Sequence, residues 1–332
     1  MQGLGTVKKT VNMFAYFIQS KAIIIMQNLV KFSIASVLCF AITGCDFGKK
    51  SSTVVTPTVK PRQPVIALAL GGGGAKGFAH IGVIKVLESH GIKPQIVTGT
   101  SAGSFVGSLY ASGKTPYQLQ EIALKLEESD IRDLTVSRQG FVIGQKLQDF
   151  VNRQIGNKPI EKFPKRFIAV ATALDSGKKT EFNRGNAGQA VRASCSIPNV
   201  FIPATIAGKQ YIDGGLVSPI PVETARKMGA DIVIAVDISA RPKSGQSTNL
   251  WGLLDQTINI MGQSSIQYEL KQADIVIKPA VGHLGVLDLK ARNQSILAGE
   301  QAAQQQIPQI KKKLAEFAKS TRALQAPAKA QI

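Results

Sequence analysis

Short apolar runs alternate with amphipathic stretches from Pro64 onward. Continuous apolar runs of strand length are typical of strands buried on both faces of a parallel sheet. Runs of this kind predict strands over residues 65–70, 95–99, 167–174, 230–238 and 273–279. Apolar positions at helical spacing predict helices over residues 77–90, 102–112, 116–129, 145–155 and 291–319. The alternation of strand and helix indicates an open α/β sheet.

The segment 64–310 contains no internal repeat and no linker, so we expect one domain there. Gly82 lies inside the first predicted helix and slightly weakens that prediction, unless it marks close packing on the sheet. Residues 113–144 have two open interpretations: a lid over a site, or an ordinary packed helix.

The N-terminal region has the pattern of a targeting segment. Residues 29–44 are nearly all apolar, too short for a membrane span and suited to the core of a signal peptide. They end in Ile42-Thr43-Gly44-Cys45, which resembles a bacterial lipobox. The resemblance implies that residues 1–44 are a lipoprotein signal peptide and that Cys45 carries the lipid anchor. A translation start at Met26 would give that signal a more compact form.

Such a protein would be a cell-membrane lipoprotein of a bacterium, facing the periplasm, with the choice of inner or outer membrane open. Several acyl chains on one residue hold a protein stably on a bilayer. The alternative is an uncleaved N-terminal anchor, which also places the protein on a membrane. Residues 45–63 are polar and contain proline, as expected of a tether between anchor and domain.

Charge is concentrated at the two ends of the chain. The 332 residues carry a formal net charge of +19, with 44% hydrophobic residues. Residues 1–63 contain eight basic residues and one acidic residue, and residues 311–332 contain six basic residues and one acidic residue. We interpret 311–332 as a basic, flexible tail. No basic run is interleaved with aromatic residues, which argues against nucleic-acid binding. The three cysteines and three histidines have no metal-site spacing.

A candidate nucleophile follows the second predicted strand. Residues 99–103 (GTSAG) fit the pattern G-x-S-x-G, in which a serine hydroxyl stands on a tight turn between a strand and a helix. Gly99 and Gly103 would leave the space that such a turn needs. The pattern is common by itself, and its position between strand and helix favours Ser101 as a nucleophile.

The glycine-rich segment 71–77 (GGGGAKG) follows the first predicted strand. The N–H groups of such a loop converge on an anion, either a phosphate or the oxyanion of an acyl intermediate. A dinucleotide site would require an acidic residue at the end of the second strand, but that strand leads into Ser101. We therefore interpret Gly72, Gly73 and Gly74 as an oxyanion hole.

The third element is Asp213, followed by Gly214 and Gly215. Alone, this segment would indicate a hairpin turn. In chain order, however, Gly72–Gly77, Gly99–Gly103, Ala193–Pro198 and Asp213–Gly215 match G-G-G-x-[RK]-G, G-x-S-x-G, A-S-x-[AS]-x-P and D-G-[GA]. Their order and spacing resemble the patatin-like phospholipase family over residues 64–280.

The resemblance implies a three-layer α/β/α sandwich with a mostly parallel central sheet. It also implies that Ser101 is the nucleophile and Asp213 its base, in a dyad without histidine. Lys76, where the family often has Arg, is expected to brace the glycine loop; the alternative is an exposed cation. The implied reaction is hydrolysis of carboxylic esters of phospholipids, lysophospholipids or related acyl esters, with no metal or cofactor.

Other interpretations compete with the dyad. A Ser–Asp–His triad would use His283, and His80 lies close to the glycine loop, but we expect structural roles for both. Cys195 is expected to be a small buried residue rather than a nucleophile. The alternative function is a catalytically silent, membrane-tethered lipid-binding or scaffold lipoprotein. The intact nucleophile, base and anion loop argue against it.

Overall fold

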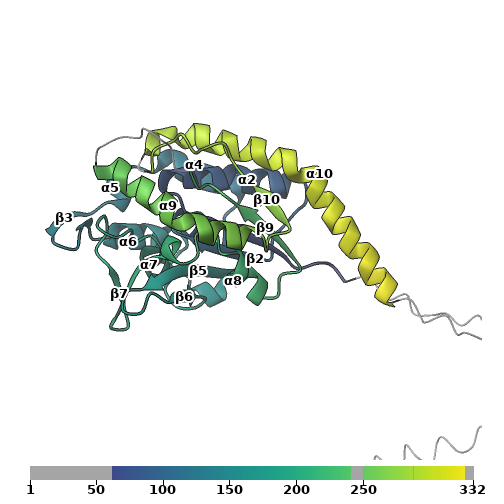
Figure 1. The fold of residues 1–332 in the computed structure, drawn as a ribbon, viewed down its shortest axis with the longest axis horizontal. Coiled ribbons are helices and arrows are strands. Elements are labelled where there is room, and N and C mark those ends of the chain that lie inside the picture. Colours follow the sequence, from purple (N-terminus) through teal and green to yellow (C-terminus); the bar gives the residue numbers. More distant parts are fainter. Residues whose placement is uncertain (1–61, 241–249, 287, 326–332) are drawn as a thin grey trace, which may run out of the picture. The chain divides into compact units, whose positions relative to one another are not determined.

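The structure, a computed structural model, describes residues 62–240, 250–286 and 288–325. The predicted signal peptide, the lipidation site Cys45 and most of the tether lie outside these residues. Within the described chain, eight strands form one sheet in the order β10-β9-β1-β2-β5-β8-β7, with β6 paired to β5 (Figure 1). The strands of this sheet are β1 Ile66–Leu70, β2 Ile96–Thr100, β5 Arg166–Ala173, β6 Lys179–Phe182, β7 Ala204–Ile206, β8 Lys209–Asp213, β9 Ile232–Val236 and β10 Ile275–Ile277.

The sheet is parallel from β10 to β5, and the remaining strands make antiparallel pairs. β10, β9, β1, β2 and β5 pair in parallel, whereas β8 and β6 run antiparallel to β5. β7 and β8 form a hairpin around Ala207 and Gly208, which both have positive φ (49° and 77°). All five predicted strands are confirmed within two residues at each end, and the antiparallel edge was not predicted.

Helices cover both faces of the sheet. The α-helices are α2 Ala79–Ser89, α3 Ala102–Ala111, α4 Pro116–Lys125, α5 Glu128–Ile131, α6 Gln145–Gln154, α7 Ala187–Ser194, α8 Val222–Lys227, α9 Leu250–Leu270 and α10 Arg292–Gln325. Short 3₁₀ helices are η1 Gly74–Phe78, η2 Ile160–Lys162, η3 Gly214–Leu216 and η4 Leu289–Ala291. This arrangement confirms the predicted three-layer α/β/α sandwich with a mostly parallel sheet.

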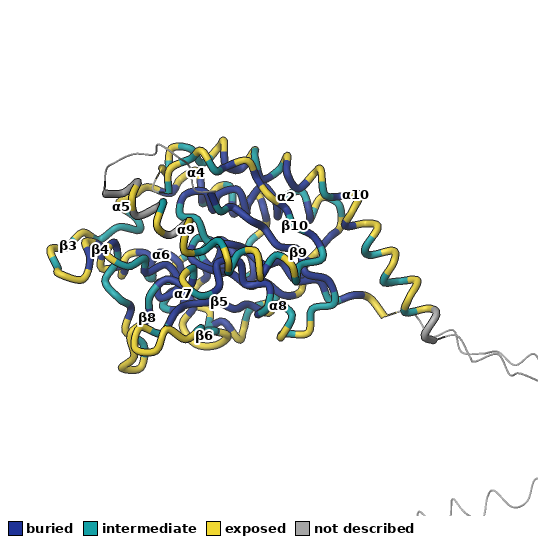
Figure 2. Tube along the Cα trace, viewed as in Figure 1, coloured by how far each residue is buried: buried dark blue, intermediate teal, exposed yellow. Residues whose placement is uncertain are grey.

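The side chains of β1 alternate between the two faces of the sheet and pack against the helices on each face. Leu68 and Leu70 join a large apolar core with residues of α2, α3, α7 and α10. Ala67 and Ala69 point to the opposite face, where a smaller core contains residues of α8 and α9. Because successive strand residues face opposite sides of the sheet, the two faces of β1 pack against different sets of helices. Figure 2 shows the central parallel strands as continuously buried, whereas β6, β7 and β8 are largely half-buried or exposed.

Two glycines allow α2 and α10 to cross closely. A Cβ on Gly82 would lie 2.0 Å from the carbonyl oxygen of Ile296, and a Cβ on Gly299 would lie 2.0 Å from that of Ala79. The predicted helix is therefore continuous through Gly82, and the close packing that this glycine allows is with α10 rather than with the sheet. Figure 1 shows α10 lying along α2.

Three further differences from the sequence predictions concern the middle and end of the chain. The helix predicted over 116–129 is divided into α4 and α5. The segment 113–144 also contains a separate two-stranded sheet, β3 Leu134–Ser137 and β4 Gly140–Val142. α10 continues to Gln325, so residues 311–325, assigned to a flexible tail, are helical. Among the described residues, no helix is long and apolar enough to cross a bilayer.

Candidate active site

Ser101 occupies a strained turn between β2 and α3. Its φ and ψ are 52° and −124°, a conformation that non-glycine residues rarely adopt. The Ser101 N–H donates to Ser194 Oγ at 2.8 Å, and Ser194 Oγ donates to the carbonyl of Val170 at 2.6 Å. The Ser101 carbonyl accepts the N–H groups of Ser104 and Phe105, the first bonds of α3. Strand, helix and Ser194 thus hold this backbone in place.

The flanking glycines have the predicted role of leaving space. A Cβ on Gly99 would lie 2.4 Å from the carbonyl oxygen of Gly103, and a Cβ on Gly103 would lie 2.1 Å from that of Leu70. A Cβ on Gly77 would lie 2.6 Å from the Cβ of Ala102. Larger residues at these positions would push the nucleophile turn away from the glycine loop.

Asp213 reaches the same level of the sheet along the edge of β5 that β2 also occupies, since β6 pairs along the opposite edge. Thr100 of β2 pairs with Val170, and Asp213 of β8 pairs with the next residue, Ala171. The Asp213 N–H donates to the Ser196 carbonyl at 2.9 Å. Asp213 Oδ1 accepts the Gly215 N–H at 2.7 Å, and Oδ2 is buried with no hydrogen-bond partner in the described chain.

The glycine after Asp213 is required by close packing. A Cβ on Gly214 would lie 2.1 Å from the Val170 carbonyl oxygen. Gly215 contributes the N–H that holds Oδ1. The structure therefore places Gly214 and Gly215 as supports of the carboxylate.

Burial makes Asp213 a stronger base than an ordinary aspartate. Desolvation raises the pKa of Asp213 from 3.8 to about 6, and the nearby Ser101 hydroxyl and Gly215 N–H offset part of that effect. The Ser101 hydroxyl is close enough to stabilise the carboxylate charge, although the two side chains do not meet the geometry of a hydrogen bond in this structure. At neutral pH the carboxylate is ionised with a free acceptor, Oδ2, beside the nucleophile.

The glycine loop supplies backbone donors beside Ser101. A Cβ on Gly72 would lie 3.3 Å from Ser101 Cβ, which shows how closely loop and nucleophile approach. The Gly72 N–H, predicted to bind the oxyanion, donates instead to the Pro219 carbonyl at 3.0 Å. Within the described residues, the N–H groups of Gly73 and Gly74 have no hydrogen-bond partner, so these two are the available donors.

A buried carboxylate fixes the loop that leads from Asp213 to α8. Glu269 of α9 accepts a short hydrogen bond from Ser218 Oγ and the Glu223 N–H at 2.8 Å. The Ser218 carbonyl accepts Thr100 Oγ1 at 2.7 Å, one residue before the nucleophile. Glu269 therefore connects α9 to both sides of the dyad.

Lys76 and His80 lie beneath the glycine loop. Lys76 is 1% exposed in η1, which excludes the alternative of a surface cation. His80 Nε2 donates to the Gly71 carbonyl at 2.8 Å. Burial lowers the pKa of His80 to about 4, so the ring is neutral at physiological pH. His80 supports the loop and forms no hydrogen bond with Ser101 or Asp213.

His283 and Cys195 do not complete a triad. The exposed His283 pairs with the Gln294 side chain at 2.9 Å and lines neither cavity described below. Cys195 is buried next to Ser104, and burial raises the pKa of its thiol well above the usual range. A protonated, buried thiol is a poor nucleophile, which agrees with the structural role predicted for it.

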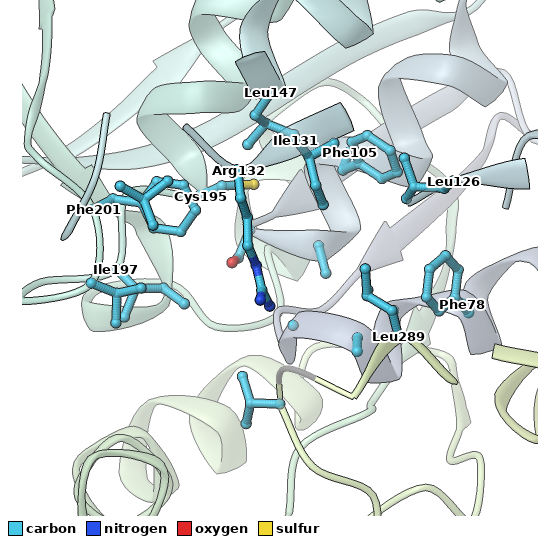
Figure 3. Close-up of a pocket in the computed structure, with 18 of the residues that line it drawn as sticks. Phe78, Phe105, Leu126, Ile131, Arg132, Leu147, Cys195, Ile197, Phe201 and Leu289 are labelled. Atoms are coloured by element: carbon cyan, nitrogen blue, oxygen red, sulfur yellow. The ribbon is translucent and has the colours of Figure 1, made fainter. Parts of the chain in front are cut away.

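Two cavities meet at Ser101. The larger, of about 230 Å³, is lined almost entirely by apolar side chains, and Figure 3 shows Phe105, Leu126, Leu147 and Phe201 around it. Arg132 is its one charged lining residue among those described. The smaller, of about 80 Å³, is lined by Ser101, Asp213 and the glycine loop. An acyl chain in the larger cavity would thus present its carbonyl to the dyad.

The segment that carries these groups matches a known family. Residues 68–226, from β1 to α8, match the family model described as patatin-like phospholipase. That range holds the glycine loop, Ser101 and Asp213 in the expected order. The chain belongs to the patatin-like phospholipase family.

Relatives of this patatin-like domain are found in bacteria and fungi. An uncharacterized NTE family protein of Mycobacterium tuberculosis is 37% identical over 180 residues, which cover 53% of this chain and 50% of the relative. Lysophospholipase NTE1 of Coccidioides immitis is 35% identical over 181 residues, covering 53% of this chain and 12% of the relative. The chain therefore matches half or less of the length of these relatives.

A solved structure shares the fold. VipD from Legionella pneumophila superposes with a TM-score of 0.50 at 13% sequence identity, covering 74% of this chain and 66% of that chain. At such low identity the likeness concerns the fold alone.

Two supporting residues of this site were absent from the predicted set. Ser194 belongs to the A-S-x-[AS]-x-P segment that the sequence analysis used for recognition, so a signal for it existed. Glu269 lies in α9, 56 positions after Asp213, and no local pattern singles it out.

Proposed function

We propose that this patatin-like domain is a serine acyl hydrolase that cleaves carboxylic ester bonds of phospholipids or lysophospholipids. Family membership supports lipid ester hydrolysis in general. The observation that carries the finer proposal is the position of Ser101: it stands on a strained turn, beside the free Oδ2 of Asp213, where an apolar cavity opens.

Acylation uses the dyad directly. Asp213 Oδ2 accepts the proton of Ser101 Oγ as this oxygen bonds to the acyl carbonyl carbon, and the carbonyl oxygen takes up the negative charge. The N–H groups of Gly73 and Gly74 would stabilise that oxyanion, with a contribution of about 3 kcal/mol per donor. The intermediate collapses as the ester C–O bond breaks, and the leaving alcohol takes the proton from Asp213.

Deacylation reverses the roles. Asp213 accepts a proton from a water molecule that attacks the Ser101 ester. The second tetrahedral intermediate releases the fatty acid, and Ser101 Oγ recovers its proton from Asp213. Buried Ser101 and a base with a pKa of about 6 suit this cycle at neutral pH.

The cavities favour a lipid ester as substrate. The apolar walls of the larger cavity suit an acyl chain. Arg132, the one charged residue among its described lining residues, pairs with Glu128 and could also contact an anionic group. The name of the Coccidioides relative, a lysophospholipase, supports the same class of substrate.

The membrane location is part of the proposal. Cleavage after residue 44 and lipidation of Cys45 would hold the hydrolase at a bacterial membrane, close to its lipid substrate. The lipobox-like segment and the polar tether support this, and globomycin treatment tests it. Inhibition of lipoprotein signal peptidase should leave a longer precursor of the wild-type protein, whereas Cys45→Ser should give that longer form with or without the inhibitor.

A fluorophosphonate probe distinguishes the hydrolase from a silent lipid-binding lipoprotein. We expect the wild-type protein to be labelled and Ser101→Ala to remain unlabelled at equal thermal stability. Fatty-acid release from lysophosphatidylcholine should be lost in the same variant. Binding of lipid by the wild-type protein without labelling or release would favour the silent lipoprotein.

A further inference from the structure

The β3–β4 hairpin exposes apolar side chains. Leu134 and Val136 of β3 are 77% and 103% exposed, and Phe141 and Ile143 on the return strand are exposed as well. Figures 1 and 2 show the hairpin at one end of the molecule, with an exposed tip. Single exposed apolar residues are common on proteins, but four on one short hairpin form a distinct surface.

Strand β3 of the hairpin exposes its apolar residues and partly buries its polar ones, which is the reverse of a hairpin strand that faces water. In β3 the apolar Leu134 and Val136 point outward, whereas the polar Thr135 and Ser137 are half-buried. A hairpin on a soluble surface normally buries its apolar residues and exposes its polar ones. The exposed residues of β3 are therefore suited to contact with an apolar surface outside the protein.

This surface is continuous with the larger cavity. Leu134 and Phe141 line the cavity that reaches Ser101, together with Ile131 and Arg132 at the start of the hairpin. A path lined by apolar side chains thus leads from the exposed hairpin to the nucleophile.

Charge around the hairpin is compatible with phospholipid headgroups. Residues 134–144 contain one charged side chain, Arg138, at the exposed turn. Two carboxylates that precede the hairpin are engaged: Asp133 accepts the N–H groups of Gly144 and Gln145, and Glu128 pairs with Arg132. The exposed part of the hairpin therefore combines apolar side chains with a cation.

We propose that the β3–β4 hairpin docks the enzyme onto a phospholipid surface by inserting Val136 and its apolar neighbours among the acyl chains. The proposal builds on the proposed function, because docking there brings ester substrates to the cavity mouth. A partner protein fits less well: four side chains at ~150 Å² each expose less than the ~800 Å² per partner of a standard interface. A protein covering them would also close the cavity mouth.

Vesicle binding tests the proposal in full-length Cys45→Ser protein, where no lipid anchor is attached. The probe is a vesicle of phosphatidylcholine with phosphatidylglycerol. Val136→Asp should weaken partitioning onto these vesicles by about tenfold or more, since burial of one such side chain is removed. Val136→Leu should retain binding. Leu297→Asp, on the exposed side of α10, is the matched control and should stay within about twofold of wild type.

Two further measurements separate the possible outcomes. Hydrolysis of a soluble short-chain ester should be unchanged by Val136→Asp, because Val136 lines neither cavity. The emission of Val136→Trp should shift to the blue when vesicles are added, while that of Leu297→Trp should not. Equal vesicle binding by Val136→Asp and wild type would overturn the proposal, as would a dimer that only Val136→Asp dissociates. Hairpin-dependent binding without hydrolysis of any ester would instead refute the proposed function and leave the docking surface intact.

Discussion

Asp213→Asn should abolish activity and stabilise the fold. The variant keeps the shape of the side chain and an oxygen that can accept the Gly215 N–H, but it removes a buried charge whose Oδ2 has no partner. The rise in the pKa of Asp213 from 3.8 to about 6 corresponds to about 3 kcal/mol of cost to the ionised folded state. We therefore expect the free energy of unfolding at neutral pH to increase by up to about 3 kcal/mol.

The pH dependence of this gain has a definite sign. Between pH 3.8 and about 6 the folded wild-type protein binds a proton that the unfolded chain does not. Lowering the pH through this window therefore stabilises the wild type relative to the variant. The advantage of Asp213→Asn should be complete above the folded pKa and absent below pH 3.8.

Urea unfolding at a series of pH values measures the effect. Asp175→Asn is the matched control, since it removes an equal charge from an exposed turn and should change stability by less than about 0.5 kcal/mol. If Asp213→Asn does not increase the free energy of unfolding at neutral pH, or if the increase persists unchanged at acidic pH, then Asp213 is not desolvated and ionised in the folded protein. Fluorophosphonate labelling of the same samples measures the reactivity of Ser101, which Asp213→Asn should lose and Asp175→Asn should keep.

Three other predictions concern the site and its supports. Wild-type kcat/KM should fall about tenfold per pH unit below the Asp213 pKa of about 6, measured with a soluble ester; a flat profile would exclude Asp213 as the base. Glu269→Ala should lower kcat about tenfold or more with KM for that ester little changed, and Glu269→Gln should recover part of it, because the amide retains one acceptor for Ser218 or Glu223. Ala207→Asn should raise the free energy of unfolding by about 1 kcal/mol without altering activity, because its positive φ suits Asn; an unchanged urea midpoint would contradict this.

The parallel half of the fold and the dyad were predictable because their signals are local. Residues 66–70 form a continuous apolar run directly before the glycine loop, and Ser101 lies within five residues of both its strand and its helix. The antiparallel edge has no such signal. β6 is half-buried throughout and β7 is three residues long, so neither shows a continuous run or a clear alternation.

Long-range contacts account for what the sequence could not indicate. The Gly72 N–H is taken by Pro219, and only the folded path of the loop after Asp213 brings that carbonyl into reach. Glu269 acts on Ser218 from across 51 positions of chain. Gly82 packs against Ile296 rather than the sheet, which depends on where α10 returns. Each of these contacts depends on tertiary geometry rather than on neighbouring sequence.

The pairing of β2 and β8 with successive residues along one edge of β5 has a consequence for biogenesis. A chain synthesised as far as Ala173 already contains the glycine loop, Ser101 and the strand beside it, but its base lies 40 residues further on. β8 pairs only with β5 and β7 in the main sheet as described, so Asp213 arrives when the antiparallel edge closes. A nascent or truncated chain therefore contains Ser101 but lacks the carboxylate that would accept the proton of its hydroxyl. In the proposed mechanism, hydrolysis begins only once β8 has paired with β5.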